Sequence, residues 1–277
     1  MRRVSRSRSM FKLLAMVIVL TMFVTTLFAA TPTPIPLSGL EAKFMVDSSK
    51  VVQEGTTALT AEAQSLFGVT SSTNMIVAYI DNDSKLFNND GWSNRLRKKE
   101  NKSNYELQYK KRYPVVNGDI DAALKLAAAD GLTADLTGYT AEVDWGFDKM
   151  TLSIATETKV KTTTGLFLPE QNVGVNMVKA NSPAEQSAYT YDGARYYGPV
   201  TFTRHVGTFM GTEIDIEVWP IVSADGTGVD TITEVSFKGT TLEEVTTVRE
   251  ALRDFLSQQG ILLEQDSLKT QLILERY

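Results

Sequence analysis

Charged side chains alternate with apolar ones in several short stretches of this sequence. The clearest stretches are 213–218 (EIDIEV) and 234–238 (EVSFK), and the same alternation is found at 41–43, 95–97 and 106–110. Because successive side chains of a β-strand point to opposite faces, each stretch places its charges on one face. Two structures would explain this: a sheet with one face in solvent, or a barrel with a charged interior and helices packed outside. The barrel would be a binding site.

The charged residue types in these stretches suit a phosphate ligand and a metal ion. Arginine binds phosphate oxygens through two parallel hydrogen bonds, whereas lysine acts as a point charge. Carboxylate oxygens select Mg²⁺ or Mn²⁺, and such an ion can bridge phosphate oxygens. Acids and bases in one cavity must pair or bind ions, since a buried unpaired charge is costly. Any single stretch is more typical of a solvent-exposed sheet face.

The composition excludes several other kinds of site. The 277-residue chain has no cysteine, so it can form no disulfide, thiolate metal site or cysteine nucleophile. Its formal charge is -5, and without residues 1–30, which hold five basic and no acidic residues, it falls to -10. An acidic protein is a poor general binder of nucleic acid, and we expect no nucleic-acid partner. The single histidine, His205, is expected at the surface or in packing, and no Ser-His-Asp arrangement, phosphate loop or dinucleotide-binding glycine motif is evident.

Residues 1–30 have the pattern of a secretory signal. A basic start containing four arginines and Lys12 precedes an apolar run from Leu13 to Ala30. We expect export to the cell surface, periplasm or medium, with cleavage near Ala30. The alternative is an uncleaved membrane anchor, because the cleavage pattern is incomplete and the run is near the lower length limit for spanning. Prolines at alternating positions in 31–37 predict an extended tether, followed by a folded domain at 38–277.

Beyond the tether, the pattern predicts a mostly β fold of the α+β class. Strands are expected at 40–46, 74–79, 92–100, 105–113, 200–209, 212–221 and 231–238, with a further hairpin within 141–161. Helices are expected at 48–67, 119–130 and 241–259. The last begins with a capping box, Thr241 and Glu244, and its apolar stripe should pack on the outside of the barrel. Residues 165–198 show no period and are expected to form a long surface insertion.

The order of the charged positions resembles that of the CYTH or triphosphate tunnel metalloenzyme superfamily. The matching elements are Glu41-x-Lys43, Arg95-x-Arg97 after a Tyr-Ile-Asp strand, Leu107-x-x-Lys110, Arg204, the acidic strand 213–217, Glu234-Val-Ser-Phe-Lys238, the amphipathic helix and Ser267-Leu-Lys269. The resemblance covers essentially the whole chain after the tether, and 118–198 is the least matched part. Five charged stretches in this order favour the charged barrel interior over a solvent-exposed sheet face.

The resemblance implies an antiparallel eight-stranded β-barrel, or tunnel, with helices packed outside. Members hydrolyse inorganic triphosphate, thiamine triphosphate or nucleoside triphosphates, and some make cyclic AMP or polyphosphate. The phosphate-binding residues that it implies are Lys43, Arg95, Arg97, Lys110, Arg204 and Lys269, with Lys238 as a further candidate. The ligands that it implies for Mg²⁺ or Mn²⁺ are Glu41, Asp215, Glu217 and Glu234, of which Glu41 and Glu217 are also the catalytic candidates.

Two positions depart from the family pattern. Gly39 stands where the first strand normally begins Glu-x-Glu-x-Lys, and Ser236 stands where the late acidic strand often has a second Glu. Both positions tend to be metal ligands in the family, so these departures weigh against hydrolysis but not against anion binding; Glu213 could compensate. The functions considered are an exported, divalent-metal-dependent phosphohydrolase for triphosphate or polyphosphate, a catalytically inactive polyanion-binding module of the same fold, and a structural domain with a polar sheet face.

Overall fold

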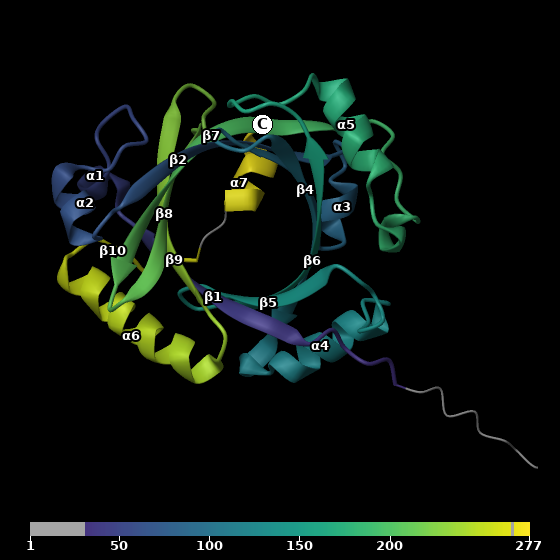
Figure 1. Cartoon of the computed structure of the whole chain (residues 1–277), viewed down its shortest axis with the longest axis horizontal. Helices are drawn as coiled ribbons and strands as arrows, with labels where there is room; N and C mark the ends of the chain where they lie inside the picture. Colours follow the sequence, from purple (N-terminus) through teal and green to yellow (C-terminus); the bar gives the residue numbers. More distant parts are fainter. Residues whose placement is uncertain (1–30, 267–268) are drawn as a thin grey trace, which may run out of the picture. The chain divides into compact units, whose positions relative to one another are not determined.

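The strands of this chain close into a ring (Figure 1). The structure, a computed structural model, describes residues 31–266 and 269–277. In this part, nine strands follow one another around the barrel in the order β1-β5-β6-β4-β3-β2-β7-β8-β9, and β9 pairs back with β1. Their bounds are β1 Leu37–Val46, β2 Ser71–Asp81, β3 Trp92–Lys99, β4 Asn104–Val115, β5 Tyr139–Trp145, β6 Met150–Lys161, β7 Arg195–Phe209, β8 Thr212–Val222 and β9 Val229–Gly239; a short β10, Leu262–Leu263, pairs with β1 outside the ring.

The expected barrel of eight antiparallel strands is wrong in its strand number and in one pairing. The ring has nine strands, and β1 runs parallel to β5 with Glu41 beside Asp144. A closed ring with an odd number of strands cannot alternate direction throughout, so one neighbouring pair must be parallel. Helix α4 lies between β4 and β5 in the chain, and it returns the backbone so that β5 enters the barrel in the direction of β1.

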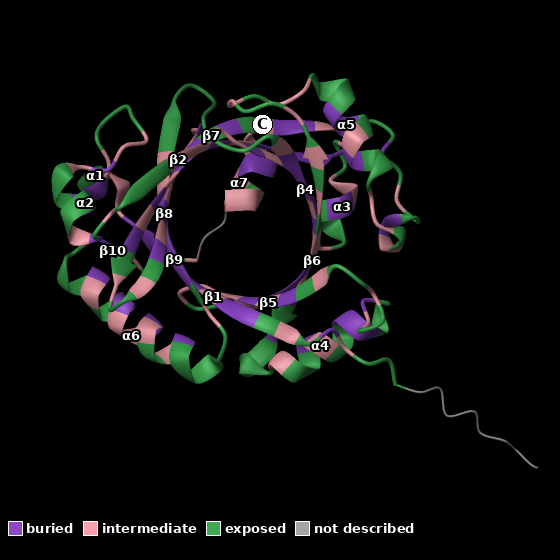
Figure 2. Cartoon of the chain, viewed as in Figure 1, coloured by how far each residue is buried: buried purple, intermediate pink, exposed green. Residues whose placement is uncertain are grey.

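Most helices of the described residues lie around the outside of the barrel (Figure 1). Their bounds are α1 Ser48–Val51, α2 Ala61–Leu66, α3 Leu86–Asn89, α4 Ile120–Ala129, α5 Gln171–Ala180 and α6 Leu242–Gln258, with short 3₁₀ turns at Val116–Gly118 and Ala184–Gln186. The outward faces of the strands form the main apolar core beneath them, and Figure 2 shows the strands largely buried or half-buried. The barrel surface is therefore apolar outside, as a tunnel with a polar interior requires.

The helix predictions are confirmed at 119–130 and 241–259. The Oγ1 of Thr241 accepts a hydrogen bond from the Glu244 amide at 3.2 Å, and Val245, Leu252 and Leu256 of α6 are buried. The continuous helix expected at 48–67 is wrong: the chain there forms α1 and α2, with a bridge between Val52 and Leu59 in the gap. The insertion at 165–198 contains α5, which packs against β3 and β7.

One helix, α7 (Lys269–Arg276), lies inside the ring (Figure 1). Its Ile273 and Leu274 are buried in a second apolar cluster, separate from the main core. The barrel wall contributes Met75, Val77, Tyr79, Tyr197, Val200, Phe202, Trp219 and Ile221 to this cluster. The interior is thus divided: α7 fills the part lined by β2, β7 and β8, and the rest of the lumen is lined by charged residues.

Part of the predicted tether packs on the domain. Pro34 bridges to Thr133, and Ile35 is buried in the main core. The predicted signal at 1–30 lies outside the described residues, as does Ser267. Among the residues that are described, no helix has both the length and the apolar character needed to cross a membrane.

Candidate functional site

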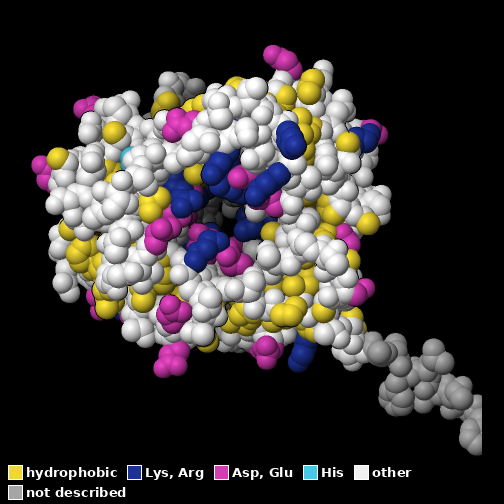
Figure 3. Space-filling model, viewed as in Figure 1, with side chains coloured by type: hydrophobic (Ala, Val, Ile, Leu, Met, Phe, Trp, Pro, Cys, Tyr) yellow, Lys and Arg dark blue, Asp and Glu magenta, His cyan; other side chains and the backbone are white. Residues whose placement is uncertain are grey.

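Inward-facing positions of the barrel carry charged residues from every part of the predicted site. Figure 3 shows basic and acidic side chains gathered around a central hollow. Strand pairing places Arg204 beside Glu217, Glu217 beside Glu234, and Glu41 beside both Lys238 and Asp144. The predicted site residues of the strands, which are far apart in the sequence, therefore occupy inward-facing positions of one barrel, and Lys269 joins them from α7.

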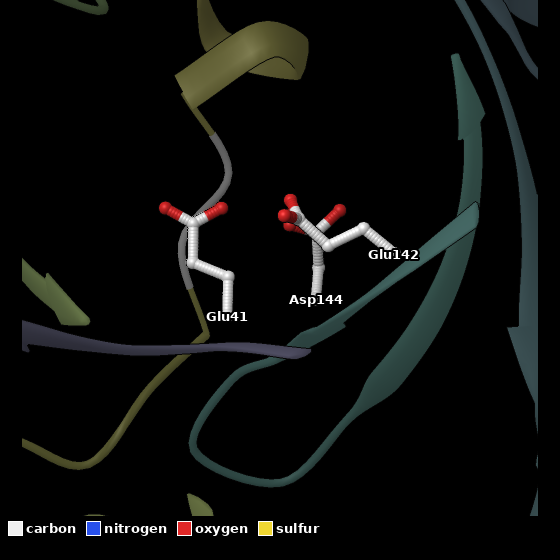
Figure 4. Close-up of side chains that lie close together, drawn as sticks. All are labelled: Glu41, Glu142 and Asp144. Atoms are coloured by element: carbon white, nitrogen blue, oxygen red, sulfur yellow. The ribbon is translucent and has the colours of Figure 1, made fainter. Parts of the chain in front are cut away.

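The β1–β5 wall holds three carboxylates close together. Glu41, Glu142 and Asp144 each offer an oxygen, and these oxygens lie within 4.8 Å of one another (Figure 4). Lysines surround the group: the Lys43 ammonium lies 2.7 Å from Asp144 and 3.0 Å from Glu41, and Lys238 lies 2.6 Å from Glu142. The group is half-buried, so an ion could reach it from the lumen.

The three carboxylates fit a divalent ion. Three converging carboxylate oxygens are the donor set that Mg²⁺ and Mn²⁺ prefer. Burial acts to raise the pKa of Asp144, but Lys43 and Lys110 outweigh it and hold the pKa well below its usual value. The pKa of Glu41 is also lowered, since Lys43 and Lys238 outweigh the effect of burial. Both carboxylates are therefore ionised at neutral pH, as metal ligands must be.

The β7–β8–β9 wall pairs each of its predicted acids with a cation. The Arg204 Nε donates to Asp215 at 2.8 Å. The Lys269 ammonium, from α7, donates to Glu217 at 2.6 Å and to Glu234 at 2.8 Å. Burial acts to raise the pKa of Glu217, but Lys269 and the indole N–H of Trp219 outweigh it and bring the pKa to about 2.

The β3–β4 wall carries most of the remaining predicted cations. Arg97 donates from both Nε and Nη2 to one oxygen of Glu106, at 2.7 and 2.6 Å. Arg95 makes no ion pair within the described part of the chain, and its Nε is buried without a hydrogen-bond partner. Burial and the charge of Arg97 lower the pKa of Arg95 to about 10. Lys110 lies 3.7 Å from Asp144, and burial lowers its pKa to about 8 although Asp144 opposes the shift.

The sequence analysis missed Glu142 and Asp144. It expects a hairpin within 141–161 but assigns no inward face to it; Val143 is buried in the outer core, and the two acids occupy the alternate positions, which face the lumen. The alternation of side chains between the two faces of a strand, which selects Glu41 and Lys43, would also have selected Glu142 and Asp144. Glu106 was noted only as part of a charged stretch, and its pairing with Arg97 depends on strand register.

The departure at Gly39 has a steric cause. A Cβ atom at this position would lie 2.9 Å from the carbonyl oxygen of Gly239, where β1 meets β9. The close approach of the two strands therefore leaves no room for a glutamate. Glu142 and Asp144 on β5 supply acids next to this position, since Gly39 is paired with Glu142.

Comparison with solved structures identifies the fold. The putative adenylyl cyclase HpAC1 from Hippeastrum, which is described as having a dominant triphosphatase activity, superimposes with a TM-score of 0.51 at 13% sequence identity, over 86% of this chain and 99% of that protein. A putative adenylate cyclase from Bacillus halodurans gives a TM-score of 0.46 at 11% identity, over 85% of this chain and 97% of that protein. No family model matches the sequence, and no curated protein matches it.

Proposed function

Because the chain has the fold of the CYTH and triphosphate tunnel proteins, we propose that it is an exported, divalent-metal-dependent phosphohydrolase acting on triphosphate or polyphosphate. The observation that carries the proposal is Arg95. Strand pairing places Arg95 on the inward face beside Tyr79, and its Nε is buried without a hydrogen-bond partner among the described residues. A polyphosphate chain would supply the missing acceptor oxygens.

The cations of the lumen fall into two groups that would bind phosphate in different ways. Among the predicted phosphate-binding residues, Arg95 and Lys110 are the least neutralised by carboxylates of the described residues and would hold the phosphates first. Arg97 and Arg204 pair with Glu106 and Asp215 and would exchange these partners for phosphate oxygens when ligand binds. The pairing keeps the cations extended into the lumen, which lowers the cost of ordering them when ligand binds.

Glu41, Glu142 and Asp144 would hold the Mg²⁺ or Mn²⁺ ion, with Lys43 and Lys238 beside them. When bound, the ion would screen the phosphate charge and polarise the phosphoryl group that is attacked. Asp144 accepts a hydrogen bond from Ser153 at 2.6 Å, which fixes the orientation of the carboxylate. The proposal thus keeps Glu41 as a ligand and adds two acids from β5. Glu217 would act by holding Lys269 in place.

Phosphate release from tripolyphosphate, with and without Mn²⁺ or Mg²⁺, tests this function. We expect metal-dependent release that falls by roughly two orders of magnitude or more in Asp144→Asn, because a metal ligand is lost. Asp254→Asn, an exposed position on α6, is the matched control and should retain activity. Absence of release would contradict the hydrolase.

A polyanion-binding module of the same fold is the second candidate, because Asp215, Glu217 and Glu234 are already neutralised by Arg204 and Lys269. It predicts no release, together with an increase in melting temperature when tripolyphosphate is added. An unchanged melting temperature and no release would contradict both candidates.

A further inference from the structure

The internal helix α7 places a lysine between two carboxylates of the barrel wall. The Lys269 Nζ lies 2.6 Å from Oε2 of Glu217 and 2.8 Å from Oε1 of Glu234. Glu234 is only 2% exposed, and within residues 31–266 and 269–277 its second oxygen has no hydrogen-bond partner. The Glu217 oxygen that binds Lys269 also accepts from the Trp219 indole at 3.1 Å. The ammonium therefore occupies the space in which these two acids would bind a cation.

The position of Lys269 on its helix is unfavourable without these acids. Lys269 is the first described residue of α7 and lies at the N-terminal end of this part of the helix, where the positive end of the helix dipole repels a cation by typically 0.3–1 kcal/mol. Burial also acts against its charge, yet Glu217 and Glu234 raise its pKa above the usual value. The carboxylates thus decide where this ammonium sits.

The helix prevents Lys269 from leaving. Ile273 and Leu274, one turn further along α7, are buried against the inner wall. At the far end, Arg276 donates to Asp230 at 2.7 Å and to the carbonyl of Val222 at 2.9 Å. By contrast, Lys238, which pairs with Glu142 of the three-carboxylate group, is 61% exposed and can turn toward solvent. An entering ion can displace Lys238 more easily than Lys269.

We propose that Lys269 is a permanent internal cation that takes the place of a second divalent ion, so that the tunnel binds one divalent ion per chain, at Glu41, Glu142 and Asp144. Lys269 then supplies the positive charge that faces the phosphates from the β8–β9 wall. The number of one ion per chain rests on the metal site of the proposed function. The proposal that Lys269 prevents an ion from binding to Glu217 and Glu234 does not rest on it.

Counting bound Mn²⁺ tests the inference. We would titrate the full chain with Mn²⁺ alone, without phosphate, and measure the number of ions per chain by calorimetry and by electron paramagnetic resonance. The expected count is one for the wild type and two for Lys269→Met, because the freed Glu217 and Glu234 then bind an ion. Arg276→Met, which removes the other cation of α7, is the control and should bind one. Adding Glu234→Gln to Lys269→Met should return the count to one.

Each outcome bears on a different part of the inference. Two ions in the wild type would overturn it, whether or not any variant folds. A folded Lys269→Met that still binds only one ion would also overturn it. No ion in the wild type and one in Lys269→Met would contradict the proposed metal site while supporting the blocking role of Lys269. No ion in either protein would contradict both.

Discussion

Strands β2 and β3 are neighbours in the barrel, yet their inward faces have opposite characters. Val77 of β2 pairs with Arg97 of β3, and Tyr79 pairs with Arg95. The β2 residues belong to the apolar cluster around α7, whereas Arg97 pairs with Glu106 and Arg95 has a buried Nε without a partner among the described residues. Alternation along a strand thus decides which side chains point inward. Whether the inward side becomes core or binding site depends on what else occupies the interior.

The largest effect should come from breaking the apolar part of this interior. Ile273 is fully buried, and Ile273→Ala should destabilise the protein by about 2–5 kcal/mol, as for other large buried side chains. Leu126→Ala, at a residue of α4 that is 55% exposed, is the control and should change stability by less than about 0.5 kcal/mol. Urea unfolding measures both. A loss below about 1 kcal/mol for Ile273→Ala would mean that α7 does not stabilise this wall.

A substitution in the charged part of the interior should lower the affinity for phosphate rather than the stability of the protein. Arg95→Met should weaken tripolyphosphate binding by about 1.5–3 kcal/mol, roughly 10- to 150-fold, since a charged hydrogen-bond donor is lost. Removing an arginine that has no carboxylate partner in the part of the chain that the structure describes should leave stability unchanged or raise it. Calorimetry at fixed salt provides the affinity, with Arg253→Met on α6 as the control. Equal affinities of the wild type and a folded Arg95→Met would remove the main support for phosphate binding.

The pH dependence of binding tests the low pKa of Lys110. The pKa is about 8, so Lys110 is mostly charged at pH 7 and mostly neutral at pH 9. Phosphate favours the charged form, so binding above pH 8 must take up a proton and becomes weaker as pH rises. The affinity ratio of wild type to Lys110→Met should fall about tenfold between pH 7 and pH 9. This ratio cancels the titration of tripolyphosphate itself, and a constant ratio would contradict the shift.

Much of the site could be predicted because two features can be read directly from the sequence: the alternation of side chains within a strand, and the order of the charged positions along the chain. Glu41, Arg95, Lys110 and Glu217 were selected by alternation and by resemblance, and all line the lumen. The strand ranges read directly from the pattern number nine, and the count of eight came from the resemblance alone. The contacts between residues on different strands could not be predicted. Which acid meets which base depends on register and closure, so the pairing of Lys269 with Glu217 and Glu234, and the entry of α7 into the ring, had no sequence signal.

The smallest effect sharpens the comparison within β3 itself, between Arg97, which is paired, and Arg95, which has no ion pair with the residues that the structure describes. Glu106 binds Arg97 through two nitrogens and Lys99 at 3.2 Å, so it competes with phosphate for both cations. Glu106→Gln removes the competing charge and should tighten tripolyphosphate binding by up to about 1 kcal/mol, roughly fivefold, the value of a partly exposed ion pair. Glu250→Gln, which breaks ion pairs on α6, should leave the affinity unchanged. If Glu106→Gln instead weakens binding, Glu106 holds Arg97 in position for phosphate. Arg95 and Arg97 would then differ because Glu106 orients Arg97, and not because Glu106 competes with phosphate for it.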